Sequence, residues 1–396
     1  MKFDAIFLDR DGTISHDPYG YINDVKDYDF FDFTFEALEL LHQYSDKFFI
    51  VTNQSGLSTG KIDIDNLESI HAYIDDEFRK RKLPLKNIYF ADTEGNVKSI
   101  DISTGIVNWS IKLDKLASGI SSGFGVLIVS NTTGEVICLD QEKGSILWSR
   151  DVKGEVLSNA AIDAKIIVIK TSSGELLGLS KESGTTKWSY RSKLPTLTIR
   201  GSSSPIIEEN KVYATFDSGR LGVFELDSGF LLWDSAISYA SGNSELENII
   251  DSDSKPVIEG NFIYATNYQG SLSIFDNAQR RQVWNSPISS FYEPVVLKGI
   301  IAVIEDDSDI KTFASKTLNE SWSSNEYKNR ELSNAISHKG QIIIGDLDGF
   351  IHIINPVNGQ TIGRKKISRK PIMTLYSRSN QFYAVDNNFN LFSLSI

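Results

Sequence analysis

The six tryptophans of this chain occupy one repeating frame. Five of them follow a glycine by fourteen residues, and Trp322 follows Ser308 at the same distance. The steps between successive tryptophans are 39, 40, 45, 51 and 38 residues. The glycine and tryptophan pairs are Gly95 and Trp109, Gly134 and Trp148, Gly174 and Trp188, Gly219 and Trp233, and Gly270 and Trp284. A period near 40 residues, with short alternating strands and glycine turns, predicts a β-propeller over residues 88–396.

Each repeat predicts several strands joined by tight turns. In the copy at 88–109, a β-rich run ends at a turn around Gly95, a second strand follows, and a third carries Trp109. Glycine suits such turns because it adopts positive φ without a Cβ clash. We interpret the tryptophans as structural plates that pack against neighbouring blades. Gly349 opens a seventh copy and Tyr383 an eighth, so we expect eight blades, of which the first and last are incomplete.

Blades of the form A-D-x-x-G-x-x-x-A-x-D-x-x-T-G-x-x-x-W resemble the pyrroloquinoline-quinone-type propeller repeat. The stretches 194–205 and 242–256 are in addition similar to the outer-membrane assembly lipoprotein family BamB. This resemblance implies an eight-bladed propeller that is a scaffold and not an enzyme, with no cofactor in the propeller. It implies, as partner, the barrel-inserting subunit of the machinery that assembles β-barrel proteins into the bacterial outer membrane. The family is periplasmic and anchored to the outer membrane.

The two longest tryptophan steps, 45 and 51 residues, place extra residues in two loops between repeats. Loops of this kind concentrate binding residues. The resemblance implies that apolar, arginine and aspartate positions in these loops contact the partner. The matching residues are Leu197, Ile199, Arg200, Asp251 and Asp253, with Ile199 at a position that is usually leucine. The alternative interpretation is that Arg200 pairs with one of the aspartates and only stiffens the loops.

Residues 1–87 lack this repeat and indicate alternating strands and helices. An apolar run ends at Asp9, an amphipathic helix is expected near 34–45, and a second strand near 47–52 precedes a further helix. This order predicts an α/β layer with a parallel sheet. We therefore expect two domains, a partial α/β domain over 1–87 and the propeller over 88–396.

Two short motifs of the front domain carry chemistry. D-R-D-G-T at 9–13, joined to V-T-N-Q-S-G at 51–56, resembles the haloacid-dehalogenase phosphohydrolases that act on heptose bisphosphate or histidinol phosphate. The resemblance implies that Asp9 is a carboxylate nucleophile and Asp11 a general acid and base. The implied site consists of Asp9 and Asp11 beside a Mg²⁺ ion, with Thr52 and Asn53 at the phosphate.

The remaining parts of such a phosphatase site are missing from the sequence. The lysine and the late acidic pair of the family pattern do not follow, and Cys138 alone cannot supply the cysteine and histidine zinc loop of this subgroup. Gly345-Asp346-Leu-Asp348 resembles the late metal motif, but it precedes Gly349 in the propeller frame, so we interpret it as a turn. Phosphoryl transfer depends on positioned charge and metal. We therefore expect an inactive fragment; the alternative is a Mg²⁺-dependent phosphatase with a propeller appendage.

Composition also argues against several other classes of protein. A net charge of −12 and a pI near 5.0 argue against a nucleic-acid partner, whose phosphates would repel the chain. One cysteine excludes an internal disulfide, and it argues against a quinone-dependent dehydrogenase, a class that commonly uses a vicinal cysteine pair. The sequence shows no membrane-spanning run, signal peptide or N-terminal lipidation cysteine, which favours the cytoplasm and leaves the location open. The combination of a phosphatase-like start and a propeller could come from a natural gene fusion or from a reading frame that joins two unrelated genes. We favour the second explanation.

Overall fold

The computed structural model describes most of the propeller repeats and short segments before them. The described residues are 6–9, 28, 30–31, 34–42, 48–51, 73, 87–101, 106–192, 203–238, 254–297, 299–378, 381–388 and 390–396. The chain divides into two compact units. The first comprises Met1–Ile88 and Ser99–Asn108, and the second Tyr89–Lys98 and Trp109–Ile396.

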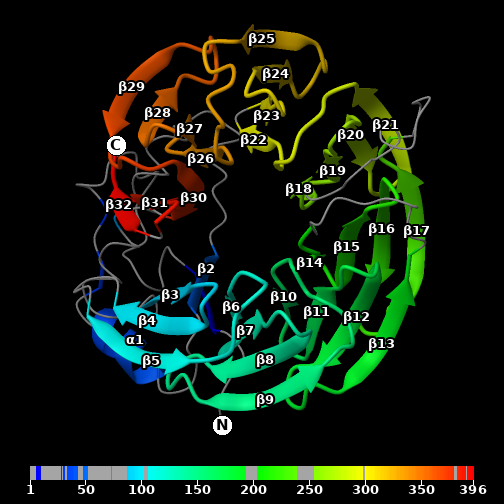
Figure 1. Ribbon diagram of the computed structural model, residues 1–396, viewed down its shortest axis with the longest axis vertical. Helices are drawn as coiled ribbons and strands as arrows, with labels where there is room; N and C mark the ends of the chain where they lie inside the picture. Colours follow the sequence, from blue (N-terminus) through cyan, green and yellow to red (C-terminus); the bar gives the residue numbers. More distant parts are fainter. Residues whose placement is uncertain are drawn as a thin grey trace. The chain divides into compact units, whose positions relative to one another are not determined.

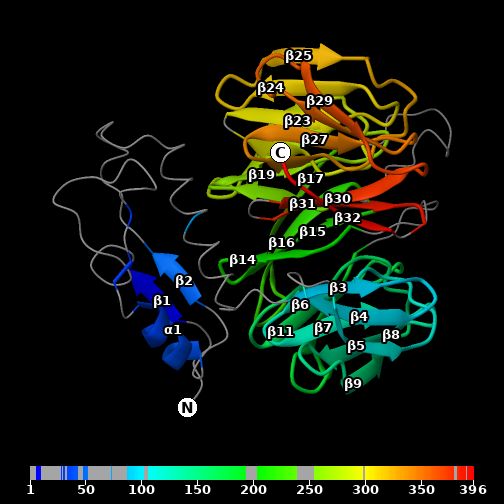
Figure 2. The same ribbon diagram turned by 90° about the vertical axis from the view of Figure 1, so that its left-hand side faces the viewer.

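The first unit contains a parallel pair of strands. β1 (Ile6–Asp9) and β2 (Phe48–Val51) lie side by side, with Asp9 opposite Val51 (Figure 2). α1 (Thr34–His42) lies between them in the chain. A strand, helix and parallel strand is the arrangement that the order of apolar runs predicts.

Eight sheets follow along the chain within the described residues, six with four strands and two with three. The first two sheets contain β3 (Asn87–Ala91), β4 (Asn96–Asp101) and β5 (Val107–Lys112), then β6 (Ser121–Gly123), β7 (Val126–Ser130), β8 (Glu135–Asp140) and β9 (Ile146–Asp151). The third and fourth contain β10 (Ala161–Ile162), β11 (Ile166–Lys170), β12 (Glu175–Ser180) and β13 (Thr186–Arg191), then β14 (Ile206–Glu208), β15 (Lys211–Phe216), β16 (Arg220–Glu225) and β17 (Leu231–Ala236).

The fifth and sixth sheets contain β18 (Val257–Glu259), β19 (Phe262–Ala265), β20 (Leu272–Asp276) and β21 (Arg281–Ser286), then β22 (Val295–Leu297), β23 (Ile300–Ile304), β24 (Ile310–Ala314) and β25 (Glu320–Ser324). The seventh and eighth contain β26 (Ile336–His338), β27 (Gln341–Gly345), β28 (Phe350–Ile354) and β29 (Thr361–Lys366), then β30 (Ile372–Arg378), β31 (Gln381–Asp386) and β32 (Leu391–Leu394). Every sheet pairs its strands in sequence order. Figure 1 shows the sheets around a ring, with the first strand of each four-stranded sheet nearest the centre and the last outermost. The fold is mainly β and propeller-like.

The glycine of the repeating frame lies at the hairpin between the second and third strands of a four-stranded sheet. Gly134, between β7 and β8, has a φ of +90°, and Ser308, between β23 and β24, has a φ of +73°. The equivalence of Ser308 and glycine is thus confirmed in the backbone. Gly270 differs, because the positive φ of its turn falls on Gln269 at +52°. A Cβ on Gly270 would lie 2.1 Å from Asn267 Oδ1, so a larger residue there would displace that side chain.

Four tryptophans contact the next sheet in the same way. The Nε1–H of Trp148 donates to the carbonyl of Lys181 at 2.7 Å, and the indole covers Gly184. Gly184 has a φ of +68°, and a Cβ there would lie 2.6 Å from the indole. The other pairs are Trp109 over Gly144, Trp188 over Gly229 and Trp322 over Gly359, with indole hydrogen bonds to Gln141, Leu226 and Pro356 of 3.3, 2.7 and 2.8 Å. The interpretation of these four tryptophans as packing plates is confirmed.

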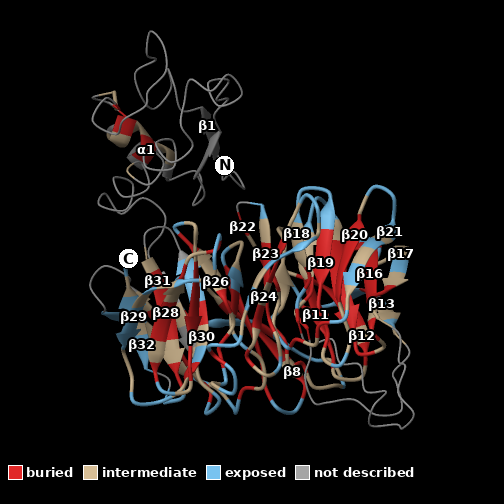
Figure 3. Ribbon diagram, turned by 90° about the horizontal axis from the view of Figure 1, so that it is seen from above, coloured by how far each residue is buried: buried red, intermediate tan, exposed pale blue. Residues whose placement is uncertain are grey.

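Apolar clusters join consecutive sheets. Leu127 and Val129 of β7 pack with Val97 of the first sheet, while Val126 and Ile128 belong to the cluster shared with the third. Strand side chains alternate between faces, so a middle strand contributes to both neighbours and is buried along its length, as Figure 3 shows for β11. Seven such clusters link the eight sheets, and none within the described part of the chain links the eighth sheet to the first. In the part described here, no helix has the length and apolar character to cross a membrane.

Candidate partner-binding site

Two connections between sheets carry the residues that the sequence predicts for partner binding. One joins β13 to β14 and the other joins β17 to β18. The five candidate positions all lie outside the described residues: Leu197, Ile199, Arg200, Asp251 and Asp253. The structure does describe where each connection ends, at the anchor residues Ser203 and Ser254.

A buried lysine fixes the first anchor residue. Lys170, the last residue of β11, is 1% exposed, and its Nζ donates to Ser203 Oγ at 3.1 Å and to the carbonyl of Thr215 at 2.9 Å. The same Nζ lies 3.3 Å from Asp217 Oδ1, and that carboxylate is also buried. A charge removed from water needs such a partner and such hydrogen bonds. The third sheet therefore holds the end of the connection that enters the fourth.

Hydroxyl groups fix the second anchor residue in a similar manner. Thr215 Oγ1 donates to the carbonyl of Ser254 at 3.0 Å, and Ser254 Oγ donates to the carbonyl of Thr266 at 2.7 Å. Thr266 Oγ1 in turn donates to the carbonyl of Tyr292 at 2.7 Å. All of these atoms except those of Tyr292 belong to residues that are less than 9% exposed. Since Thr215 also accepts from Ser203, one residue couples the ends of both connections.

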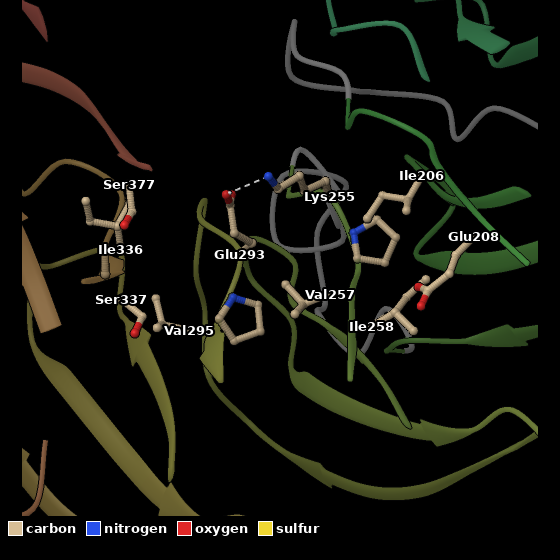
Figure 4. A pocket seen from close by; sticks show the side chains of 13 residues that line it. Ile206, Glu208, Lys255, Val257, Ile258, Glu293, Val295, Ile336, Ser337 and Ser377 are labelled. Atoms are coloured by element: carbon tan, nitrogen blue, oxygen red, sulfur yellow. Dashed lines mark ion pairs between the residues drawn. The ribbon is translucent and has the colours of Figure 1, made fainter. Parts of the chain in front are cut away.

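A pocket of about 410 Å³ begins next to these anchor residues. Figure 4 shows its open, mostly apolar wall, with Lys255 and Glu293 facing each other in an ion pair of 3.3 Å. The lining residues are Ile206, Glu208, Lys255, Pro256, Val257, Ile258, Glu293, Pro294, Val295, Ala335, Ile336, Ser337 and Ser377. Among these described residues there is no histidine or cysteine. The pocket can hold a side chain of a bound protein, and the Oγ of its lining residue Ser377 lies 2.9 Å from His338 Nδ1.

The phosphatase-like candidates are described only in part. Asp9 is the last residue of β1, opposite the end of β2. Asp11, Thr52 and Asn53 lie outside the described residues.

The stretch that resembles a late metal motif forms a turn, as predicted. Asp346 Oδ1 accepts the backbone amides of Asp348 and Phe350 at 3.0 and 2.9 Å. Its other oxygen accepts from Arg330 Nη2 at 2.7 Å and lies 2.8 Å from His352 Nε2. Burial tends to raise the pKa of Asp346, but the hydrogen bonds from His352, Phe350 and Arg330 outweigh it and lower the pKa. This carboxylate is committed to the fold.

Sequence reasoning missed the residues that hold the loop ends. Lys170 closes an otherwise apolar run, Ile166–Lys170, and Thr215 stands in a similar run. A polar residue that ends a buried strand is a weak signal, because most such residues face water. The partners of Lys170 lie 33 to 47 residues away in the chain, so local pattern could not reveal them.

The chain matches the family model described as outer membrane protein assembly factor BamB over residues 93–324. The BamB of Alteromonas naphthalenivorans is 33% identical over 299 residues, which span 70% of this chain and 72% of that protein. The BamB of Escherichia coli K12 is 28% identical over 298 residues, spanning 72% of this chain and 76% of that protein.

Solved structures agree with these sequence matches. The crystal structure of BamB from Moraxella catarrhalis superposes with a TM-score of 0.75 at 25% identity, covering 78% of this chain and 94% of that one. A quinohemoprotein alcohol dehydrogenase from Comamonas testosteroni superposes with a TM-score of 0.59 at 11% identity, covering 76% of this chain and 68% of that one, which shows a shared fold alone. The chain belongs to the BamB family of outer membrane protein assembly factors.

Proposed function

We propose that the chain is a non-catalytic, eight-bladed propeller scaffold for the assembly of β-barrel proteins into the bacterial outer membrane. Family membership is the observation that carries this proposal. Eight consecutive sheets, of which the first and last have three strands, support eight blades with incomplete ends. In this proposal residues 88–396 form the propeller, which needs no cofactor, and residues 1–87 are a partial phosphatase-like domain.

The proposed partner is the barrel-inserting subunit of the assembly machinery, bound through the two long connections. Leu197, Ile199 and Arg200 would contact it from one connection, and Asp251 and Asp253 from the other. The coupling of both loop ends through Thr215 supports a joint surface, because it fixes the two ends relative to each other. Preorganised ends lower the entropy lost when loops bind.

Substitution of Arg200 tests this surface. We expect Arg200→Ala to leave thermal unfolding unchanged and to abolish capture of the partner's periplasmic domains. A charged contact desolvated by a partner costs ~2–5 kcal/mol when truncated, whereas an exposed ion pair contributes only ~0–1 kcal/mol. The matched control is Arg150→Ala, on the exposed face of β9, which should still bind. Capture by the Arg200 variant as strong as by the parent chain would reduce the two loops to structural connections.

The second candidate, a Mg²⁺-dependent sugar-phosphate phosphatase, has one supporting observation. Asp9 stands at the carboxyl end of a parallel strand, where such a nucleophile belongs. We nevertheless propose that the segment is inactive, since the sequence lacks the lysine and late acids of the family. The purified chain with Mg²⁺ should release no phosphate from heptose bisphosphate or histidinol phosphate. A turnover of ~1 s⁻¹ or more that disappears in Asp9→Asn would establish the phosphatase instead.

The compartment is part of the same proposal. A propeller that stays in the cytoplasm would not meet an outer-membrane partner, so location decides whether the scaffold can act. Fractionation of cells that carry the intact gene, with antibodies against the propeller, distinguishes a cytoplasmic chain from an exported one.

A further inference from the structure

The outermost strand of the seventh sheet departs from its counterparts. Its equivalents in the first six sheets each carry a tryptophan, whereas β29 has Gly363 in that place. Three cations follow Gly363 within β29, and two more lie in the connection from β29 to β30. We call these five residues the cationic segment: Arg364, Lys365, Lys366, Arg369 and Lys370. Five positive charges within seven residues stand out in a chain of net charge −12.

The backbone holds the cationic segment in a fixed place. The amide of Ile367 donates to the carbonyl of Gly349 at 2.9 Å, and Ser368 Oγ donates to Asp386 Oδ2 at 2.6 Å. The amide of Lys370 donates to Ser368 Oγ at 3.0 Å. The five steps from Lys365 to Lys370 span at most ~18 Å of extended chain. The five cations therefore follow the outer edge of the seventh sheet and its connection to β30, and we call them the cationic patch. Strand side chains alternate between faces, so Arg364 and Lys366 lie on the face of Phe350 and Lys365 lies on the face of Ile351.

No carboxylate in the described part of the chain neutralises this patch. All five cations are exposed, and none takes part in an ion pair with a described residue. Arg364 and Lys366 instead lie over the ring of Phe350, at 3.9 and 5.0 Å from its centroid. Asp386, the acid that contacts this connection, is 1% exposed and is occupied by hydrogen bonds.

Two exposed apolar side chains flank the cationic segment in the chain. Ile362, on β29, is 55% exposed, and Met373, at the start of β30, is 53% exposed. Where a protein surface lies on a membrane, its cations meet anionic headgroups and its apolar groups reach the acyl boundary. A protein partner would be expected to use a pocket with aromatic anchors. The pocket described above does not include these residues.

We propose that the cationic segment binds the anionic headgroup surface of a phospholipid bilayer, with Ile362 and Met373 at the headgroup boundary. This surface lies on the seventh and eighth sheets and does not use the two loops of the proposed function. Co-sedimentation with vesicles tests it without any partner protein. The full chain should bind vesicles of phosphatidylglycerol and phosphatidylethanolamine, should not bind vesicles of phosphatidylcholine alone, and should be released by salt.

Two triple variants of equal net charge show whether vesicle binding depends on the cationic patch or only on the net charge of the chain. Lys365→Ser, Arg369→Ser and Lys370→Ser remove cations that contact no aromatic ring, and binding should fall on the order of 100-fold, since each cation near an anionic surface strengthens binding several-fold. The control changes Arg150→Ser, Lys187→Ser and Arg191→Ser, which are exposed cations of β9 and β13, and should bind like the parent. Matched melting temperatures verify that all three proteins fold.

Three results would overturn the proposal. The parent chain could fail to bind the anionic vesicles. The two triple variants could lose binding equally, which would make the effect one of net charge. The parent could bind immobilised polyglutamate but not the vesicles, which would assign the patch to an acidic protein.

Discussion

Gly184 shows how one residue fixes the contact between two sheets. Its φ is +68°, and a Cβ there would lie 2.6 Å from the indole of Trp148. We expect Gly184→Ala to lower the free energy of unfolding by ~2–4 kcal/mol, because a left-handed alanine costs ~1–2 kcal/mol and the displaced ring adds the rest. Gly125→Ala is the matched control, since Gly125 has a φ of +80° but no atom within 4 Å of a Cβ. Urea unfolding measures both, and equal losses would contradict the role of the indole contact.

Cys138 is a second residue with a defined environment. Its side chain is fully buried in the cluster between the second and third sheets. Burial raises the pKa of its thiol to about 12, with Asp140 adding to the rise and Lys181 opposing it. Because the thiolate is the reactive form, a disulfide reagent such as DTNB should label the native chain very slowly and the urea-unfolded chain at once. Rapid labelling without denaturant would mean that these two sheets separate readily.

At the scale of elements, the β27 and β28 hairpin contains a buried titrating pair. His352 Nε2 lies 2.8 Å from Asp346 Oδ2, and both side chains are almost fully buried. Burial lowers the pKa of His352 below its ordinary 6.5, although the hydrogen bond to Asp346 opposes this. The pKa of Asp346 is also lowered, as described above. Below pH 6.5 the unfolded chain therefore binds more protons at both positions than the folded chain does.

This difference in proton binding predicts that the free energy of unfolding decreases as the pH falls. A lowered pKa in the folded state means that stability is fully present above the unfolded pKa and declines as pH falls. The contribution of His352 should decline below pH 6.5, and that of Asp346 should follow below 3.8. Unfolding temperatures at about pH 7.5 and about pH 5 should differ less in His352→Leu than in the parent. If the unfolding temperature changes equally with pH in both proteins, His352 does not cause the loss of stability in acid.

The sequence predicted local elements better than contacts between them. The fourteen-residue spacing identified Ser308 as the equivalent of glycine, because turn geometry depends on a few adjacent residues. The same spacing misassigned the positive φ at Gly270, where the fold places it on Gln269. Lys170 was not found at all, since its buried partners come from another sheet. The binding residues of the two loops came from family resemblance alone, and they lie outside the described residues.

At the scale of the propeller unit, stability should vary around the ring. Each middle sheet packs on two neighbours through separate apolar clusters, and its second strand is buried on both faces. The first and last sheets have three strands, and no cluster of described residues joins them. Each of these end sheets therefore depends on one described neighbour. A repeat structure of this kind loses stability first where a nearest-neighbour contact is missing.

Hydrogen exchange measures this gradient directly. β32 is the last strand of its sheet; Leu391 and Ile396 are exposed, and Phe392 and Leu394 are only half-buried. In β12, by contrast, five of six residues are buried, and the strand pairs on both sides. We expect amides of β31 and β32 to exchange faster than those of β11 and β12, because local opening of an end sheet breaks fewer apolar contacts. Amides of β3 to β5 should also exchange faster than those of the middle sheets. Uniform protection across all eight sheets would show instead that the first and last sheets are joined as firmly as the others.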